Sequence, residues 1–331
     1  MVKFGLELVP MEPYWKTVYY AVLAEKLGFD YVWITDHCVN RNVYTILTTI
    51  ALHTERIKMG AGVTNPYLIH PVVTAQIFAS LNEIAPGRVV CGIGPGDKTT
   101  LESVIPDYEK PLIAVKEAVQ IIRSIFTTGS VKFEGSKFIV PNVRMNFKPK
   151  QNIPIFIGAQ GPKMLSMAAE IGDGVMINAS HPKDFEIALK YLQEGITKAG
   201  KRLEDIEITA ATSVSVAEDV DKARKAATPI VAFIVAGCPP HILESHGIKP
   251  ESAQAIKDAI NKGQWKEAFS KVTSEMLDNF SIYGTPESCI EKIDKIVKLG
   301  VTLIVVGSPI GPDVRKSLML INKEIIPRFK S

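Results

Sequence analysis

Apolar residues along this chain follow two spacings that take turns. Short apolar or alternating runs predict strands at 3–9, 31–37, 57–64, 89–97, 153–158, 174–179, 206–216 and 301–307. Apolar residues at helical spacing predict helices at 14–27, 44–54, 72–85, 111–126, 163–171, 185–199 and 317–329. Strand and helix alternating in this way favour a (β/α)₈ TIM barrel over an open doubly wound sheet.

Two stretches interrupt the alternation and predict insertions in the barrel. Residues 127–150 hold a short predicted hairpin, with strands at 131–133 and 137–140. Residues 219–280 are mostly of helical pattern. Because no change of composition and no Pro- or Ser-rich linker divides the chain, the prediction is a single domain, 1–331.

Composition excludes several classes of function. The formal net charge is +3 over 331 residues, with no block of five like charges, so neither nucleic acid nor an anionic membrane is an expected partner. The N-terminal run contains Glu7, which argues against a signal peptide, and the longest apolar run, 229–238, is too short to span a membrane. Four scattered cysteines favour a reducing compartment, and we expect a cytoplasmic protein.

The carboxyl ends of the predicted strands are small or polar, and a barrel of this class carries its active site there. These ends are Glu7, Asp36-His37, 62–65, 94–97, 158–161, 178–180, Thr212-Ser213 and Gly307-Ser308. Carboxylates, an imidazole and glycine-bearing loops meeting at one rim predict a site for a large ligand with a phosphate.

Glu7 is the most suggestive single residue, because the alternation places it inside the barrel. Burial raises the pKa of a carboxyl group that has no partner, and a protonated carboxyl can act as a general acid. The alternative is an internal ion pair with a lysine or an arginine of another strand.

Two further carboxylates have equally open interpretations. Asp36, beside His37, would orient a ring system by hydrogen bonds or would cap the following helix. Asp97, after Gly-Pro-Gly, would face the ligand or cap the next helix.

The glycines at the strand ends predict close approach of a ligand to the backbone. The stretch 58–66 carries no side chain larger than valine between Gly60 and Val63, as suits a flat ligand or an unusual peptide geometry; an ordinary Asn-Pro turn is the alternative. The loop 158–161 precedes a helix whose N–H groups could bind a phosphate, completed by 178–180. Such turns are also common without phosphate.

The remaining histidines lack the spacing of metal ligands, so we expect no metal. A serine nucleophile is disfavoured because no G-x-S-x-G motif is present. The run 229–241 would wall a substrate pocket or simply be a buried helix.

Six motifs together resemble the bacterial luciferase-like superfamily, and within it the methylenetetrahydromethanopterin reductases of methanogenic archaea. They are 33–37 (WITDH), 62–66 (GVTNP), 92–97 (GIGPGD), 158–162 (GAQGP), 177–180 (INAS) and 307–313 (GSPIGPD). The resemblance spans the chain, and the motifs Gly-Pro-Gly-Asp at 94–97 and Gly-Ser-Pro-Ile-Gly-Pro-Asp at 307–313 narrow it to this subfamily. Cys38-Val39 departs from it, since relatives more often carry bulkier or more polar residues there.

The resemblance implies a barrel that binds coenzyme F420, an 8-hydroxy-5-deazaflavin, and passes hydride to methylenetetrahydromethanopterin to give the methyl product in methanogenesis. It implies a non-prolyl cis peptide at Gly62-Val63 against the ring. It implies catalytic roles for Glu7 and Asp97, and coenzyme contacts at Asp36, Gly62, Val63, Thr64, Asn65, Ala159, Gln160, Gly161, Asn178 and Ala179. Relatives form homodimers or homotetramers.

Three other functions remain open on the sequence. A flavin mononucleotide-dependent monooxygenase would use the same barrel, and an F420-dependent alcohol or sugar dehydrogenase would use Glu7 or His37 as a base. A barrel without catalysis, used for binding or assembly, would leave the rim carboxylates unexplained.

Overall fold

The computed structural model describes residues 1–105 and 108–330, and the chain divides into two compact units. The N-terminal unit comprises Lys3–Asn178 and Ile187–Thr209. The C-terminal unit comprises Met1–Val2, Ala179–Glu186 and Ala210–Ser331. The single domain expected from the sequence stays a prediction.

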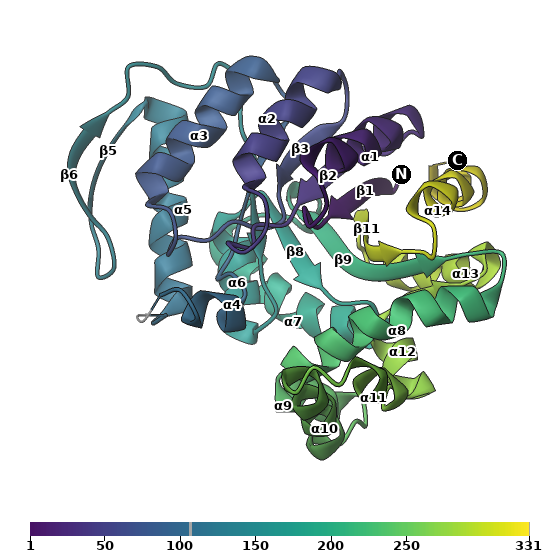
Figure 1. The fold of residues 1–331 in the computed structure, drawn as a ribbon. Coiled ribbons are helices and arrows are strands. Elements are labelled where there is room, and N and C mark those ends of the chain that lie inside the picture. Colours follow the sequence, from purple (N-terminus) through teal and green to yellow (C-terminus); the bar gives the residue numbers. More distant parts are fainter. Residues whose placement is uncertain (106–107, 331) are drawn as a thin grey trace. The chain divides into compact units, whose positions relative to one another are not determined.

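The N-terminal unit is built on six parallel strands in the order β1-β2-β3-β4-β7-β8. Figure 1 labels β1, β2, β3 and β8 of this sheet, coloured from purple to teal. Their bounds are β1 (Lys3–Leu8), β2 (Tyr31–Ile34), β3 (Lys58–Ala61), β4 (Val89–Ile93), β7 (Ile155–Gly158) and β8 (Gly174–Asn178). The strands end earlier than the sequence predicts, so most of the predicted site residues lie in the loops that follow them.

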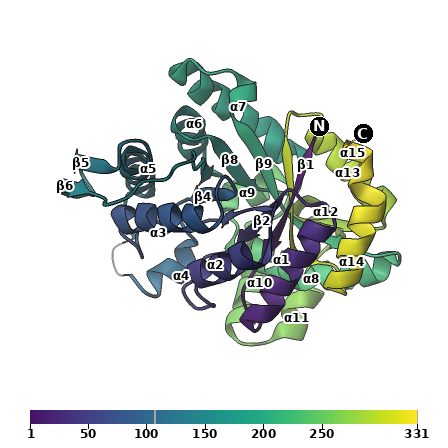
Figure 2. The same cartoon turned by 90° about the horizontal axis from the view of Figure 1, so that it is seen from above.

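Helices cover the outer side of these strands, and neighbouring helices pack on one another (Figure 2). They are α1 (Tyr14–Lys26), α2 (Val43–His53), α3 (Pro71–Ile84), α4 (Lys98–Glu102), α5 (Pro111–Thr128), α6 (Pro162–Ile171) and α7 (Pro182–Ala199), followed by a 3₁₀ turn, Leu203–Asp205. Helix α7 begins in the residues assigned to the C-terminal unit. The apolar residues along one side of each of these helices account for the burial of that side.

The predicted hairpin is present, and it lies beside α5 (Figure 1). Strands β5 (Ser130–Glu134) and β6 (Ile139–Arg144) are antiparallel. The Glu117 carboxylate on α5 accepts hydrogen bonds from the N–H groups of Ser136, Lys137 and Phe138 at 2.7–2.9 Å. A single charged acceptor thus fastens the hairpin turn to the helix.

The inner face of the N-terminal strands carries large aromatic rings opposite glycines. Tyr31 and Trp33 stack with centroids 5.7 Å apart, and Phe156 lies 5.5 Å from Trp33. A Cβ on Gly60 would lie 2.7 Å from the Trp33 ring, so the indole requires glycine on the next strand. The aromatic rings fill the space that the glycines leave.

The C-terminal unit combines parallel strands with a group of helices around their own apolar core. Its elements are β9 (Glu207–Val216), α8 (Val220–Gly237), α9 (Pro240–Ser245), α10 (Pro250–Asn261), α11 (Trp265–Ser270), α12 (Ser274–Phe280), β10 (Ile282–Gly284), α13 (Pro286–Val297), β11 (Leu303–Ile310), α14 (Val314–Leu320), a π-helical turn (Ile321–Ile325) and α15 (Pro327–Lys330). Buried side chains such as Val231, Ile256 and Leu277 join α8, α10 and α12. These helices make up the second predicted insertion.

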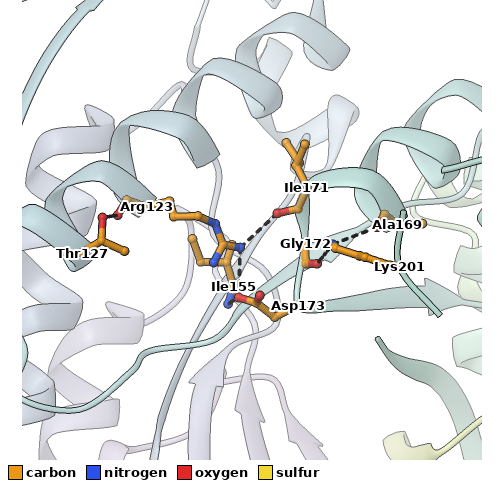
Figure 3. Close-up of polar contacts among 8 residues, drawn as sticks. All are labelled: Arg123, Thr127, Ile155, Ala169, Ile171, Gly172, Asp173 and Lys201. Atoms are coloured by element: carbon orange, nitrogen blue, oxygen red, sulfur yellow. Dashed lines mark hydrogen bonds and ion pairs between the residues drawn. The ribbon is translucent and has the colours of Figure 1, made fainter. Parts of the chain in front are cut away.

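A polar network holds the end of α6 and the start of β8 (Figure 3). The Arg123 guanidinium donates to the Ile171 carbonyl and to Asp173, both at 3.0 Å. The Lys201 ammonium donates to the carbonyls of Ala169 and Gly172, at 3.2 and 2.8 Å. Two cations therefore satisfy carbonyl groups that the helix C-terminus leaves free.

Eight parallel strands of this chain, β1–β4, β7–β9 and β11, alternate with helices as in a (β/α)₈ barrel, which confirms the predicted fold class. The short strand β10 is an addition that the sequence did not predict. Among the described residues, no helix is both long enough and apolar enough to cross a membrane.

Candidate active site

Parallel strands place the residues after their carboxyl ends at one edge, and in the N-terminal unit this edge carries nearly all of the predicted site residues. β1 supplies Glu7, β2 is followed by Asp36, and β3 by 62–65. β4 is followed by Asp97, and β7 and β8 by 159–161 and Asn178. Ala179 directly follows Asn178 and belongs to the C-terminal unit.

Glu7 is half-buried on β1, at the register position of Trp33 on β2. Among the described residues no hydrogen bond or ion pair involves its carboxyl group. Burial raises the pKa of Glu7 to about 7, because water no longer stabilises the charged form. The alternative of an internal ion pair is therefore wrong for the described residues, and the group can hold a proton at neutral pH.

The peptide bond between Gly62 and Val63 is cis, as the resemblance implies. The Val63 side chain lies over β4 and β7, because a Cβ on Gly94 would come within 2.8 Å of it and one on Gly158 within 3.1 Å. Glycines at the ends of two neighbouring strands thus make room for one valine. Gly62 and Val63 themselves are half-buried.

A chain of hydrogen bonds joins α2 to the ends of β2 and β3. The Thr64 hydroxyl donates to Asp36 at 2.7 Å, and the Tyr44 hydroxyl lies 2.7 Å from the same Thr64 oxygen. Since the single Thr64 proton goes to Asp36, Tyr44 donates to Thr64. Burial raises the pKa of Asp36, while the hydrogen bond from Thr64 and the nearby His37 oppose that rise.

Asn65 and Asp97 make local hydrogen bonds typical of turns and caps. The Asn65 amide oxygen accepts from the N–H groups of Tyr67 and Leu68 at 3.1 and 3.0 Å, and its side chain is buried. Asp97 is exposed and caps α4, accepting from Thr100 N–H at 2.8 Å. The helix-cap interpretation of Asp97 is confirmed; its catalytic role stays a prediction.

The loops after β7 and β8 meet through Gln160, whose side-chain amide donates to the Asn178 carbonyl at 2.9 Å. Ala159 is buried, and its N–H donates to the Met176 carbonyl. Gly161 precedes α6, which begins with Pro162 and has no side-chain cap. A Cβ added to Gly161 would meet no atom within 4 Å, so the helix N-terminus faces open space.

Two side chains near this edge were missed by the sequence reasoning. Tyr44 counted there only as part of a helix, and its partner Thr64 is 20 positions away. Trp33 was part of an apolar run, and its position beside Glu7 depends on the register of β1 and β2, which alternation within one strand does not give. The indole N–H of Trp33 is buried and has no hydrogen-bond partner among the described residues.

Within the part of the chain that the structure describes, no three His, Cys, Asp or Glu side chains gather in a way that would hold a metal ion. The arrangement instead combines a protonatable carboxyl, a flat backbone edge and an uncapped helix N-terminus. Such a site can bind an aromatic ring, hold an anion and move a proton.

Comparison with known proteins assigns the class to which this fold and site belong. Residues 2–303 match the family model described as luciferase-like monooxygenase, and the chain belongs to that family. It is 53% identical to the 5,10-methylenetetrahydromethanopterin reductase of Archaeoglobus fulgidus, over 99% of this chain and 100% of the relative. It is 29% identical to the F420-dependent glucose-6-phosphate dehydrogenase of Microbacterium testaceum, over 94% and 92%.

Solved structures are similar over almost the full length of the chain, and one of them shares a high sequence identity with it. The coenzyme F420-dependent tetrahydromethanopterin reductase from Methanopyrus kandleri superposes with a TM-score of 0.95 at 41% identity, and 99% of each chain is covered. The family and fold expected from the sequence motifs are therefore confirmed.

Proposed function

We propose that this protein is a coenzyme F420-dependent reductase that converts 5,10-methylenetetrahydromethanopterin to 5-methyltetrahydromethanopterin. The observation that carries the proposal is the 53% identity, over 99% of the chain, to a protein of that name. Identity of this extent covers every strand end from which the candidate site is built.

The residues at the strand ends fit the coenzyme. A flat ring suits the backbone at Gly62-Val63, where glycines on the neighbouring strands leave Val63 room. An anionic tail suits the N-terminus of α6, where free N–H groups and the helix dipole favour negative charge. Bound there, the reduced coenzyme supplies a hydride.

Glu7 supplies the proton that this reduction requires. A hydride adds to the methylene carbon, one of that carbon's two bonds to nitrogen breaks, and the released nitrogen takes up a proton. With a pKa of about 7, Glu7 is protonated in part of the molecules at neutral pH and can give its proton to that nitrogen.

The other predicted residues bind and orient. Asp36, fixed by Thr64, accepts hydrogen bonds at the ring edge, while Asn65 shapes the turn after β3. Ala159, Gln160, Gly161 and Asn178 form the phosphate end of the coenzyme site. Asp97 lies exposed and already caps α4, so it is the weaker candidate for the acid.

Turnover tests the proposal directly. Purified protein is mixed with reduced F420 and methylenetetrahydromethanopterin, and the absorbance of oxidised F420 is followed. We expect reoxidation that depends on both enzyme and pterin. Glu7→Gln should bind F420 normally and lose about 10²–10⁴ in rate.

The competing functions appear as other outcomes of the same assay. Reduction of oxidised F420 by an alcohol or by glucose 6-phosphate, with no turnover of the pterin, would assign an F420-dependent dehydrogenase. Activity with flavin mononucleotide and oxygen, and none with F420, would assign a monooxygenase. Either result would overturn the proposal.

A homo-oligomer is proposed as the functional form. Trp15 and Tyr19 on α1 are 60% and 43% exposed, next to Met11 at 70%, and aromatic residues are enriched at protein interfaces. Light scattering should give a dimer or a tetramer, and Trp15→Lys should lower the mass. A monomer in both cases would contradict this. The free cysteines agree with a cytoplasmic location.

A further inference from the structure

Trp33 carries a buried indole N–H group. Trp33 is fully buried on β2, and its Nε1 has no hydrogen-bond partner among the described residues. A buried donor without an acceptor costs about 1–3 kcal/mol, and most such groups in proteins are paired. A phenylalanine would also pack here and would leave no buried donor unpaired, so packing alone does not explain a tryptophan at this position.

Contacts of the opposite ring edge fix the direction of this N–H. The Cε3–Cζ3 edge of the indole faces β3 and β4, because added Cβ atoms on Gly60 and Gly92 would lie 2.7 and 3.3 Å from Cζ3. The pyrrole nitrogen is on the other edge of the ring. It therefore faces away from the glycines of β3 and β4.

Glu7 lies on the neighbouring strand, β1. It is the register partner of Trp33 on β1, so both side chains leave the same face of adjacent strands. Its carboxyl group also has no partner among the described residues. An unpaired donor and an unpaired acceptor thus belong to paired positions on adjacent strands.

The other titratable groups on this face of β1–β3 are engaged elsewhere or differ in character. Lys3 is ion-paired with Glu207. The Lys58 ammonium lies 5.4 Å from the centre of the Tyr31 ring, and burial raises the pKa of Tyr31 far above neutral. Among them, Glu7 is the carboxylate closest in register to the free indole N–H.

We propose that Trp33 is a positioning residue for Glu7: its indole N–H hydrogen-bonds the Glu7 carboxylate as that group gives up its proton. Burial opposes the negative charge that then develops on Glu7, and a donor aimed at the developing charge offsets that opposition. The inference rests on the proposed role of Glu7 as the acid.

Replacement of Trp33 tests the role in turnover. Trp33→Phe keeps an aromatic ring and removes the N–H. We expect kcat to fall about 10- to 100-fold, the scale of one hydrogen bond to a charged group, with KM for both substrates unchanged. The fall of kcat with rising pH should move to higher pH, since the carboxylate has lost its donor.

Phe156→Leu is the matched control, because it disturbs the same aromatic cluster and keeps the indole N–H. It should leave the pH profile of the wild type unchanged. The proposal fails if Trp33→Phe keeps the wild-type profile, or if Phe156→Leu shifts the profile as far.

A second measurement needs no turnover and separates this inference from the proposed function. In a Trp15→Phe, Trp265→Phe background, Trp33 is the only tryptophan. Its fluorescence should change with a midpoint near pH 7, and Glu7→Gln should abolish that change. A flat titration, or one that persists in Glu7→Gln, would overturn the pairing even if the enzyme reduces the pterin. The expected titration in a protein without that activity would refute only the proposed reaction.

Discussion

Two buried glutamates of this chain behave in opposite ways, and hydrogen-bond donors account for the difference. At Glu117, burial disfavours the charge, but the N–H groups of Lys137, Phe138 and Ser136 outweigh it and lower the pKa. Glu7 has no such donors, and burial raises its pKa to about 7. The first carboxylate is a structural acceptor, and the second can hold and release a proton.

Glu7→Gln should therefore stabilise the protein in a pH-dependent way. Because the folded pKa lies above the ordinary value, folding is favoured most where Glu7 is protonated in both states, and stability falls as pH rises from about 4.5 to about 7. Above pH 7 the variant should exceed the wild type in free energy of unfolding by up to about 3 kcal/mol. Below pH 4.5 the two should agree.

Urea unfolding at several pH values measures this difference. Glu117→Gln is the matched control, since a neutral amide is a poorer acceptor for three N–H groups, and it should destabilise the protein by about 1–3 kcal/mol at pH 7. An equal loss of stability at pH 8 in both variants would rule out an unpaired Glu7.

At the scale of the element, the two ends of α6 differ: side chains hydrogen-bond its C-terminus, and no side chain caps its N-terminus. Arg123 and Lys201 satisfy the carbonyl groups at its C-terminus, on residues 169–172. Its N-terminus begins with Gly161 and Pro162 and lacks a side-chain cap. Because no side chain caps this end, the N-terminal N–H groups of α6 are available for an anion.

Gly161→Asp should have opposite effects on stability and on binding. An aspartate is a good cap, and the site has both a suitable φ of −80° and free space, so stability should rise by a few tenths of a kcal/mol. The same carboxylate would occupy and repel the phosphate position, so the Kd for F420 should rise at least about tenfold. Gly161→Ala, measured beside it by fluorescence titration, should keep the wild-type Kd.

Arg123→Met should weaken only the C-terminal end of α6. The loss of bonds to Ile171 and Asp173 should cost about 1–2 kcal/mol in the free energy of unfolding, with kcat and KM unchanged. Lys116 lies at an exposed position of α5, the helix that also carries Arg123. Lys116→Met should change neither the free energy of unfolding nor the kinetic constants. A rise in KM for F420 in Arg123→Met would mean that the two ends of α6 are coupled.

The sequence predicts those features that repeat locally. Alternation located the strands of the barrel and placed Glu7 on the inner face, because successive residues of a strand point to opposite faces and this pattern is visible in the sequence. The chain of Tyr44, Thr64 and Asp36 was not predictable, since its partners are 20 and 28 positions apart. The three-residue strand β10 is too short to carry a pattern.

At the scale of the whole molecule, the path of the chain links the two compact units. The backbone passes from one unit to the other after Val2, Asn178, Glu186 and Thr209. The last of these passages lies within strand β9, Glu207–Val216, so residues of a single strand are shared between the units. Neither unit is one continuous segment that could be cut out at a linker.

This path predicts one cooperative unfolding transition. In a Trp15→Phe variant, Trp33 reports on the N-terminal unit and Trp265 on the C-terminal unit, and each can be left as the sole tryptophan by one further replacement with phenylalanine. Because strand β9 runs from one unit into the other, unfolding of either unit disrupts that strand, and the two probes should give the same midpoint in urea. Circular dichroism should follow the same curve. Two separate midpoints, with one probe unfolding while the other stays folded, would show that the units are independent domains. That result would contradict the single domain predicted from a sequence without a linker or a change of composition.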